Sequence, residues 1–177
     1  MKNLSLLIVF LTVLANAQEL QKGTIIKNYG LFYNIQNPDK NLNPNKEYSV
    51  IFDIRKTSND INAVNPLIDV VARFINMHVA QGLPQKNLHL VVIMHGGASK
   101  DVLSNTAYKE RFRKKNPNLD LLKALKKNGV EIFVCGQSAL HRGIKREEVS
   151  KPVKFALSAL TVLTEYQSLN YQLIDFN

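Results

Sequence analysis

Cys135 is the only cysteine of the sequence and its first candidate for chemistry. The apolar run Ile132 to Val134 precedes it, and Gly136-Gln137-Ser138 follows it. This pattern predicts a buried strand that ends at the cysteine and gives way to a loop or the start of a helix. In open α/β sheets, ligands bind at the carboxyl ends of the strands. A helix that starts at this strand end would direct backbone N–H groups at the sulfur. Such a thiol is biased toward the thiolate, which is the nucleophilic form of cysteine.

Two other strand ends carry residues that could serve such a thiol. The apolar run 87–94 leads directly into His95-Gly96-Gly97, where the histidine could orient or deprotonate a nucleophile supplied by another strand. The strand expected at 47–54 places Asp53 near its C-terminal end. The alternatives are a histidine hydrogen-bonded to loop backbone, with glycines present for turn geometry, and an aspartate that caps a helix or turn.

The elements needed to hold these residues follow from hydrophobic periodicity. Strands and helices alternate along the chain, which favours parallel strand pairing with right-handed crossovers. We therefore predict a three-layer α/β fold, with a mostly parallel sheet of four to five strands and helices on both faces. The expected strands are 47–54, 87–94, 132–135 and 171–176, and the expected helices begin at Pro66, Leu119 and Ser150. The last helix is expected to turn Ala156, Leu157 and Leu160 inward.

The N-terminal residues predict export. Lys2 is followed by an almost wholly apolar run and by Ala15-Asn16-Ala17, so residues 1–17 are interpreted as a secretory signal peptide cleaved near Ala17. A retained membrane anchor or a buried first helix is the alternative, but the run is shorter than the ~20 residues of a spanning helix. The mature protein would be periplasmic or secreted, with no stable membrane insertion. Residues 18–46 would form an extended strap, and 47–177 one domain.

Export makes the cysteine count informative, since secreted proteins use disulfides. A single cysteine cannot form one within its own chain, so Cys135 is an inert buried residue, a reactive thiol or an intermolecular pairing site. Its position at the end of a strand favours function. A basic segment farther along adds His141 and Arg142 as sources of positive potential for an anionic sulfur.

Composition argues against several other functions. The formal net charge is +9, but the basic residues are mixed with acidic ones and lack an aromatic stacking ladder, so we expect solvated helix faces and no nucleic-acid partner. No Gly-rich dinucleotide fingerprint or Walker-type loop follows any strand, and the four histidines lack paired ligand spacing. We therefore predict neither a cofactor nor a metal.

Several stretches together resemble the DsrE/DsrF-like family, and in particular its exported members. They are His95 to Ala98, Asn116 to Leu119, Gly129 to Ser138, Ala156 to Ala159 and Leu169 to Ile174. The resemblance implies a flavodoxin-like parallel sheet, assembly into homotrimers or hexamers, and, in the sulfur-oxidation branch, a cysteine that carries sulfur as a persulfide. It places that role on Cys135 and implies a protein that donates or accepts the sulfur.

Three functions remain open at this point. The first is a sulfur-relay or other thiol-based role for Cys135, with His95 and the backbone of 136–138 in support. The second is a non-catalytic oligomeric binding protein of the cell envelope in which the cysteine only packs. The third is a cysteine hydrolase with His95 as base, disfavoured because Val134 stands where a tight nucleophile elbow usually has a small residue.

Overall fold

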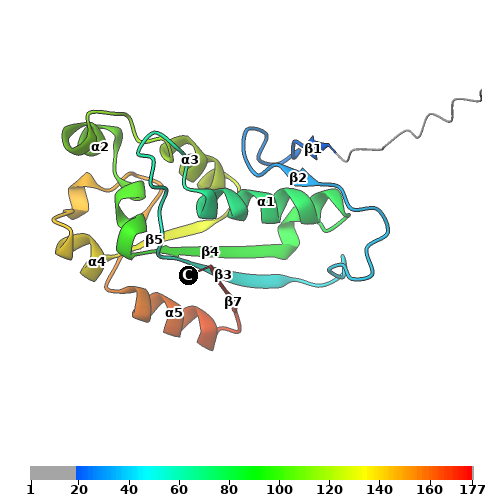
Figure 1. Ribbon diagram of the computed structural model, residues 1–177. Coiled ribbons are helices and arrows are strands. Elements are labelled where there is room, and N and C mark those ends of the chain that lie inside the picture. The colour runs from blue at the N-terminus through cyan, green and yellow to red at the C-terminus, as the bar shows by residue number, and fades with distance from the viewer. Residues whose placement is uncertain (1–18, 177) are drawn as a thin grey trace, which may run out of the picture.

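The computed structural model describes residues 19–176, and the predicted signal peptide lies outside them. The described residues form a parallel five-stranded sheet of order β6-β5-β4-β3-β7, which confirms the predicted α/β class (Figure 1). Its strands are β3 (Tyr48–Ile54), β4 (Leu88–Met94), β5 (Glu131–Cys135), β6 (Lys154–Ala156) and β7 (Gln172–Asp175). The apolar, β-branched central strands are buried on both faces, as parallel pairing requires.

The helices cover the two faces of the sheet unequally. The α-helices are α1 (Pro66–Ala80), α2 (Asn105–Phe112), α3 (Leu119–Lys127), α4 (Gly136–His141) and α5 (Ala159–Ser168), and the 3₁₀ segments are η1 (Gln85–Asn87), η2 (Gly96–Val102) and η3 (Arg146–Glu148). Figure 1 shows α1 and α3 on one side of the sheet and α5 on the other. The larger apolar core lies on the α1 and α3 side, and a smaller cluster, which includes Cys135, lies beneath α5.

The prediction for residues 150–158 was wrong. Lys154 to Ala156 form the edge strand β6, because they pair in register with Phe133 to Cys135, and the helix begins only at Ala159. Its N-cap is Ser158, whose hydroxyl accepts a hydrogen bond from the Thr161 N–H at 3.0 Å. Leu157 therefore precedes the helix and Leu160 lies on its exposed side, so these two residues, expected inside, are 71% and 76% exposed.

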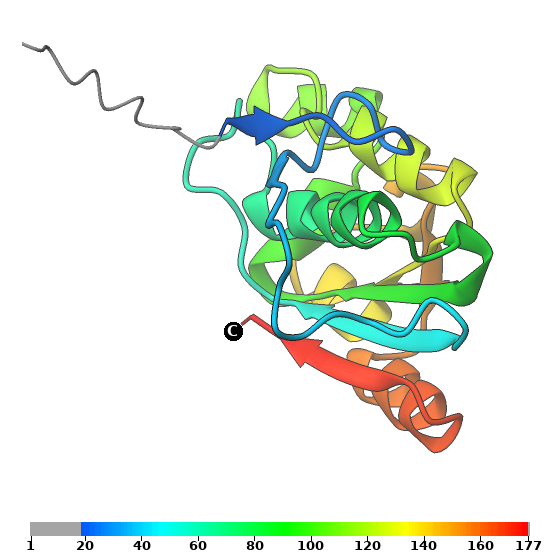
Figure 2. The same cartoon turned by 90° about the vertical axis from the view of Figure 1, so that its right-hand side faces the viewer.

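The strap crosses α1 and does not join the main sheet. Its short strands β1 (Leu20–Gln21) and β2 (Phe32–Tyr33) pair with each other in antiparallel fashion, and Figure 2 shows this blue segment alongside α1. Asn76 of α1 is buried and fixes the strap backbone. Its carbonyl accepts from the Ile26 N–H at 2.9 Å, while its amide donates to the carbonyls of Ile26, Tyr29 and Gly30 at 3.0, 2.9 and 3.2 Å.

We expect Asn76→Ala to release the strap and to lower the free energy of unfolding by about 2–4 kcal/mol, because one buried N–H and three carbonyls lose their partner together. Asn45→Ala, at an exposed position of the same segment, is the matched control and should change stability by less than about 0.5 kcal/mol. Urea unfolding measures both values, and limited proteolysis should cut the strap faster in Asn76→Ala. Equal stability of the two variants would show that Asn76 does not anchor the strap.

Candidate active site

The parallel register brings three of the predicted site residues to one edge of the sheet. Met94 of β4 pairs with Val134 of β5, and the next residue after each of these is His95 and Cys135, respectively. Adjacent strands lie about 4.8 Å apart, so the two side chains start from neighbouring positions. On the other side of β4, Asp53 pairs with Ile93. The alternation of side chains directs all three toward the face that α5 covers.

His95 and Asp53 form a direct pair. The His95 Nε2 lies 2.8 Å from the Asp53 Oδ1, and the two side chains are 21% and 13% exposed. A carboxylate can only accept, so the neutral imidazole carries its proton on Nε2 and the lone pair on Nδ1. The Asp53 carboxylate therefore sets both the tautomer and the orientation of the ring.

Cys135 is the N-cap of α4, as its position between a strand and a small polar run predicts. Its Sγ accepts a hydrogen bond from the Ser138 N–H at 3.4 Å. The residue is only 4% exposed and packs with Ile93 and with Ala159 at the start of α5. The first turn of α4 thus lies next to the sulfur and directs a backbone N–H at it.

Two glycines allow the backbone to turn at these strand ends. Gly96 has a φ of +53°, and a Cβ there would lie 2.8 Å from the Arg55 Cγ. Gly136 lies so close to β6 that a Cβ would be 2.6 Å from the Ala156 carbonyl oxygen and 2.7 Å from the Phe155 ring. Glycine is therefore required where η2 leaves β4 and where α4 leaves β5.

A buried carboxylate fixes the loop that follows His95. Asp101 is fully buried and accepts from the Thr57 hydroxyl at 2.7 Å, the Asn65 amide at 2.8 Å and the Lys100 amine at 2.9 Å. These donors tie η2 to the segment after β3, and the Ala98 N–H adds a bond of 3.1 Å to the Arg55 carbonyl. The sequence analysis missed this network, although the polar residues Thr57, Asn65 and Asp101 stand out between apolar elements.

The remaining predicted residues lie at varying distances from the sulfur. Gln137 is exposed on the first turn of α4, beside Gly136, and Gly97 approaches the Arg55 carbonyl. His141 and Arg142 are exposed at the far end of α4, about 9 Å along the helix from Cys135. The structure does not bring these two residues next to the sulfur.

The sequence analysis also overlooked Asp175 and a groove beside α4. Asp175 ends β7 in register with Asp53 and so belongs to the same sheet edge. The groove has a volume of about 330 Å³ and opens beside Gly136, with the Arg146 guanidinium 4.8 Å from the centre of the Phe155 ring. Asp53 and Asp175 thus lie at the β3 and β7 end of this edge, with Arg55 directly after β3, whereas the β6 end carries Arg146 against Phe155.

His78 of α1 lies away from this sheet edge and packs against an aromatic ring. The ring of His78 lies edge-on to Phe74, with 4.4 Å between centroids, and burial lowers the pKa of the imidazole. Between residues 19 and 176, no group of three or more His, Cys, Asp or Glu side chains is placed to hold a metal ion. Within the same range no helix has the length and apolar character needed to cross a bilayer.

Fold and site together define a parallel α/β protein with a cysteine, a histidine and an aspartate at the carboxyl edge of its sheet. Residues 64–176 match the model of the DsrE/DsrF-like family, and the chain belongs to that family. MTH1491, a protein of unknown function from Methanobacterium thermoautotrophicum, has a similar structure, with a TM-score of 0.55 and 16% identity over 73% of this chain and 99% of that one. The ychN protein from E. coli gives a TM-score of 0.49 with the same identity and coverage. Comparison with curated proteins gave no match.

Gly136→Ala should destabilise the protein by about 1–3 kcal/mol, because the added methyl group meets backbone and a ring that cannot move freely. The neighbouring Gln137→Ala is the matched control, since Gln137 is exposed on the same short helix, and we expect a change below about 0.5 kcal/mol. Chemical denaturation gives both values. If Gly136→Ala is as stable as Gln137→Ala, the close approach of α4 to β6 is not a constraint on the site.

Proposed function

We propose that this protein is a sulfur carrier in which Cys135 holds sulfur as a persulfide. The observation that carries the proposal is the position of Sγ at the end of β5, where it caps α4 by accepting a hydrogen bond from the Ser138 N–H. Backbone donors and helix N-termini stabilise an anionic sulfur at this position. Membership of the DsrE/DsrF-like family supports the same proposed role for Cys135.

The proposed reaction exchanges sulfur without net oxidation. The Cys135 thiolate attacks the outer sulfur of a donor persulfide, R–S–SH. A new S–S bond forms on Cys135, the S–S bond of the donor breaks, and R–S⁻ leaves with the electron pair. The product is Cys135–S–SH, and attack of an acceptor thiolate on its outer sulfur returns the cysteine.

The His95–Asp53 pair is proposed to assist this exchange. Asp53 holds the ring in one orientation through the 2.8 Å contact, and His95 starts from the strand position next to Cys135. A protonated imidazole adds positive charge near the sulfur anion, whereas a neutral ring offers the lone pair of Nδ1 as a proton acceptor. Both roles depend on the carboxylate that orients the ring.

The second candidate is a non-catalytic oligomeric binding protein of the cell envelope. The burial of Cys135 favours it, because a 4% exposed thiol among apolar side chains resembles a packing residue. The two candidates differ in one measurable property, which is whether the folded protein reacts through Cys135.

We also propose that the protein assembles into a homo-oligomer through its α5 face. Parallel sheets are normally covered on both faces, yet here α5 is the only α-helix of the described residues on its side. Leu157 and Leu160, the most exposed leucines of the described residues, lie at the start of this helix, and Leu169 at its end is 56% exposed. A second copy packed here would shield these side chains from water.

The site of action is proposed to be outside the cytoplasm. The predicted signal peptide at residues 1–17 supports export, and a donor or acceptor protein would then have to be present in the same compartment. Sulfur would reach Cys135 there as a persulfide.

Incubation with a small-molecule persulfide donor should add one sulfur atom to the wild-type protein and none to Cys135→Ser, as measured by intact mass. Asp53→Asn should slow the addition by about tenfold, since an amide no longer fixes the imidazole tautomer. Glu47→Gln is the matched control, because Glu47 pairs with an exposed histidine, His89, at the other end of the sheet. It should leave the rate unchanged.

Absence of added sulfur on the wild type, or equal addition to Cys135→Ser, would exclude the proposed role of Cys135 as a persulfide carrier. Alkylation then tests the second candidate. An inert core cysteine reacts with iodoacetamide only after denaturation, whereas a carrier thiol reacts in the folded protein.

Leu160→Lys should shift the protein toward the monomer, because a charge then lies on the exposed apolar side of α5. Leu20→Lys is the control, since Leu20 is 52% exposed but lies in the strap on the opposite side of the sheet. Sedimentation velocity gives the oligomeric state of each. A wild-type monomer, or a Leu160→Lys oligomer of wild-type size, would contradict assembly through α5.

A further inference from the structure

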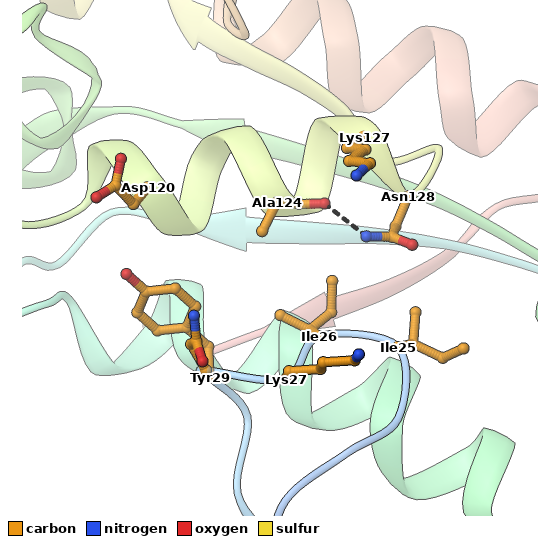
Figure 3. Close-up of a pocket in the computed structure, with 9 residues that line it drawn as sticks. Ile25, Ile26, Lys27, Tyr29, Asp120, Ala124, Lys127 and Asn128 are labelled. Carbon is orange, nitrogen blue, oxygen red and sulfur yellow. Dashed lines mark hydrogen bonds between the residues drawn. The ribbon is translucent and has the colours of Figure 1, made fainter.

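A second concave site lies on the opposite face of the sheet from Cys135, between the strap and α3. Its volume is about 460 Å³. The α3 side consists of Asp120, Ala124, Lys127 and the C-cap Asn128, whose spacing of four, three and one puts them on one face of the helix. The opposing wall is the strap segment 25–29, as Figure 3 shows.

Both walls of this groove are held in place. Asn76 anchors the strap at Ile26 and Tyr29, and Ile26 is 2% exposed, inserted into the main core. On the helix side, the Asn128 amide donates to the Ala124 carbonyl at 2.9 Å. The groove is therefore preformed, and a ligand would not have to order the chain in order to bind.

The charged groups of the groove are separated along its length. Figure 3 shows the Asp120 carboxylate and the Tyr29 hydroxyl at one end and the Lys27 and Lys127 side chains at the other. Ala124 and Ile26 lie between the two ends. Burial and the nearby carboxylates of Asp120 and Asp69 raise the pKa of Tyr29, so its hydroxyl keeps its proton.

Both lysines remain available to an anion. Within residues 19–176, neither amine has a carboxylate oxygen within 4.0 Å. At the acidic end, Asp120 pairs with Lys123 at 3.1 Å, but both side chains are more than half exposed. Such a surface pair is weak, and a ligand ammonium can replace the lysine.

We propose that this groove binds short zwitterionic peptides, with the carboxylate at Lys27 and Lys127 and the ammonium at Asp120 and the Tyr29 hydroxyl. The seven-residue separation of Asp120 and Lys127 corresponds to about 10 Å along the helix. An extended peptide advances ~3.3–3.6 Å per residue, so about three residues connect the two ends. The volume falls in the ~300–1,000 Å³ range of small-molecule sites, and the apolar floor accepts small side chains.

Titration of the purified protein with trialanine, followed by amide chemical shifts, tests this site. We expect saturable shifts confined to segment 25–29 and α3. The double variant Lys27→Gln/Lys127→Gln should bind at least fivefold more weakly, and higher salt should weaken binding to the wild type. The matched control is Lys109→Gln/Lys115→Gln, which removes two exposed lysines from the region of α2 and should bind as the wild type does.

The probe itself supplies the second control. N-acetyl-trialanine amide, which has neither terminal charge, should bind at least fivefold more weakly than trialanine. Absence of saturable shifts, equal binding of the blocked peptide, or wild-type affinity of the Lys27→Gln/Lys127→Gln variant would each overturn the proposal. Inorganic phosphate that binds as tightly as trialanine would overturn it too, because the groove would then be only an anion site.

Discussion

The parallel pairing of β3, β4 and β5 is the constraint on which the rest of the molecule depends. Seven consecutive pairs join β3 to β4, and four join β4 to β5, so the carboxyl ends of these strands are fixed relative to one another. Asp53, His95 and Cys135 are far apart in the sequence but occupy adjacent strand ends for this reason alone. The loops add the fine positioning: Asp101 holds the segment after His95, and Gly136 lets α4 begin directly at the cysteine.

The helices cover the two faces of the sheet unequally, and this difference produces two different surfaces: the groove between the strap and α3, and the exposed leucines beside α5. On one face, α1 and α3 leave a channel that the strap fills with Ile26, held by the amide of Asn76. That insertion completes the core and also creates the groove above α3. On the other face, α5 covers only part of the sheet, and its exposed leucines remain in contact with water. The first face is closed by the chain itself, whereas the second keeps exposed apolar side chains, which is the basis of the proposed assembly through α5.

Hydrophobic periodicity was sufficient for the central elements because each is long and strongly patterned. The strand at Tyr48–Ile54 and the helix capped by Asn65 follow directly from it. It failed at residues 154–158, where a three-residue strand pairs only through contacts with β5 and the cap at Ser158 decides where α5 starts. The placement of Cys135 at a strand end was predictable for the same reason as the strands. The His95–Asp53 contact and the Asp101 network were not, because they join residues 36 to 44 positions apart and depend on the order of the strands and on the paths of the loops that follow them.

The burial of Cys135 and the exposure of α5 are two aspects of the same arrangement. Cys135 belongs to the small apolar cluster that includes Ala159 at the start of α5, and the residues beside Ala159 are the exposed Leu157 and Leu160. Any protein that packs against these leucines would therefore lie next to the segment that shares this cluster with Cys135. In the proposed assembly, a second copy bound there would hold the first turn of α5 in place and narrow the approach of a sulfur donor. In the proposed carrier, access to Cys135 would therefore depend on assembly, so sulfur transfer and oligomerisation through α5 have to be measured on the same sample.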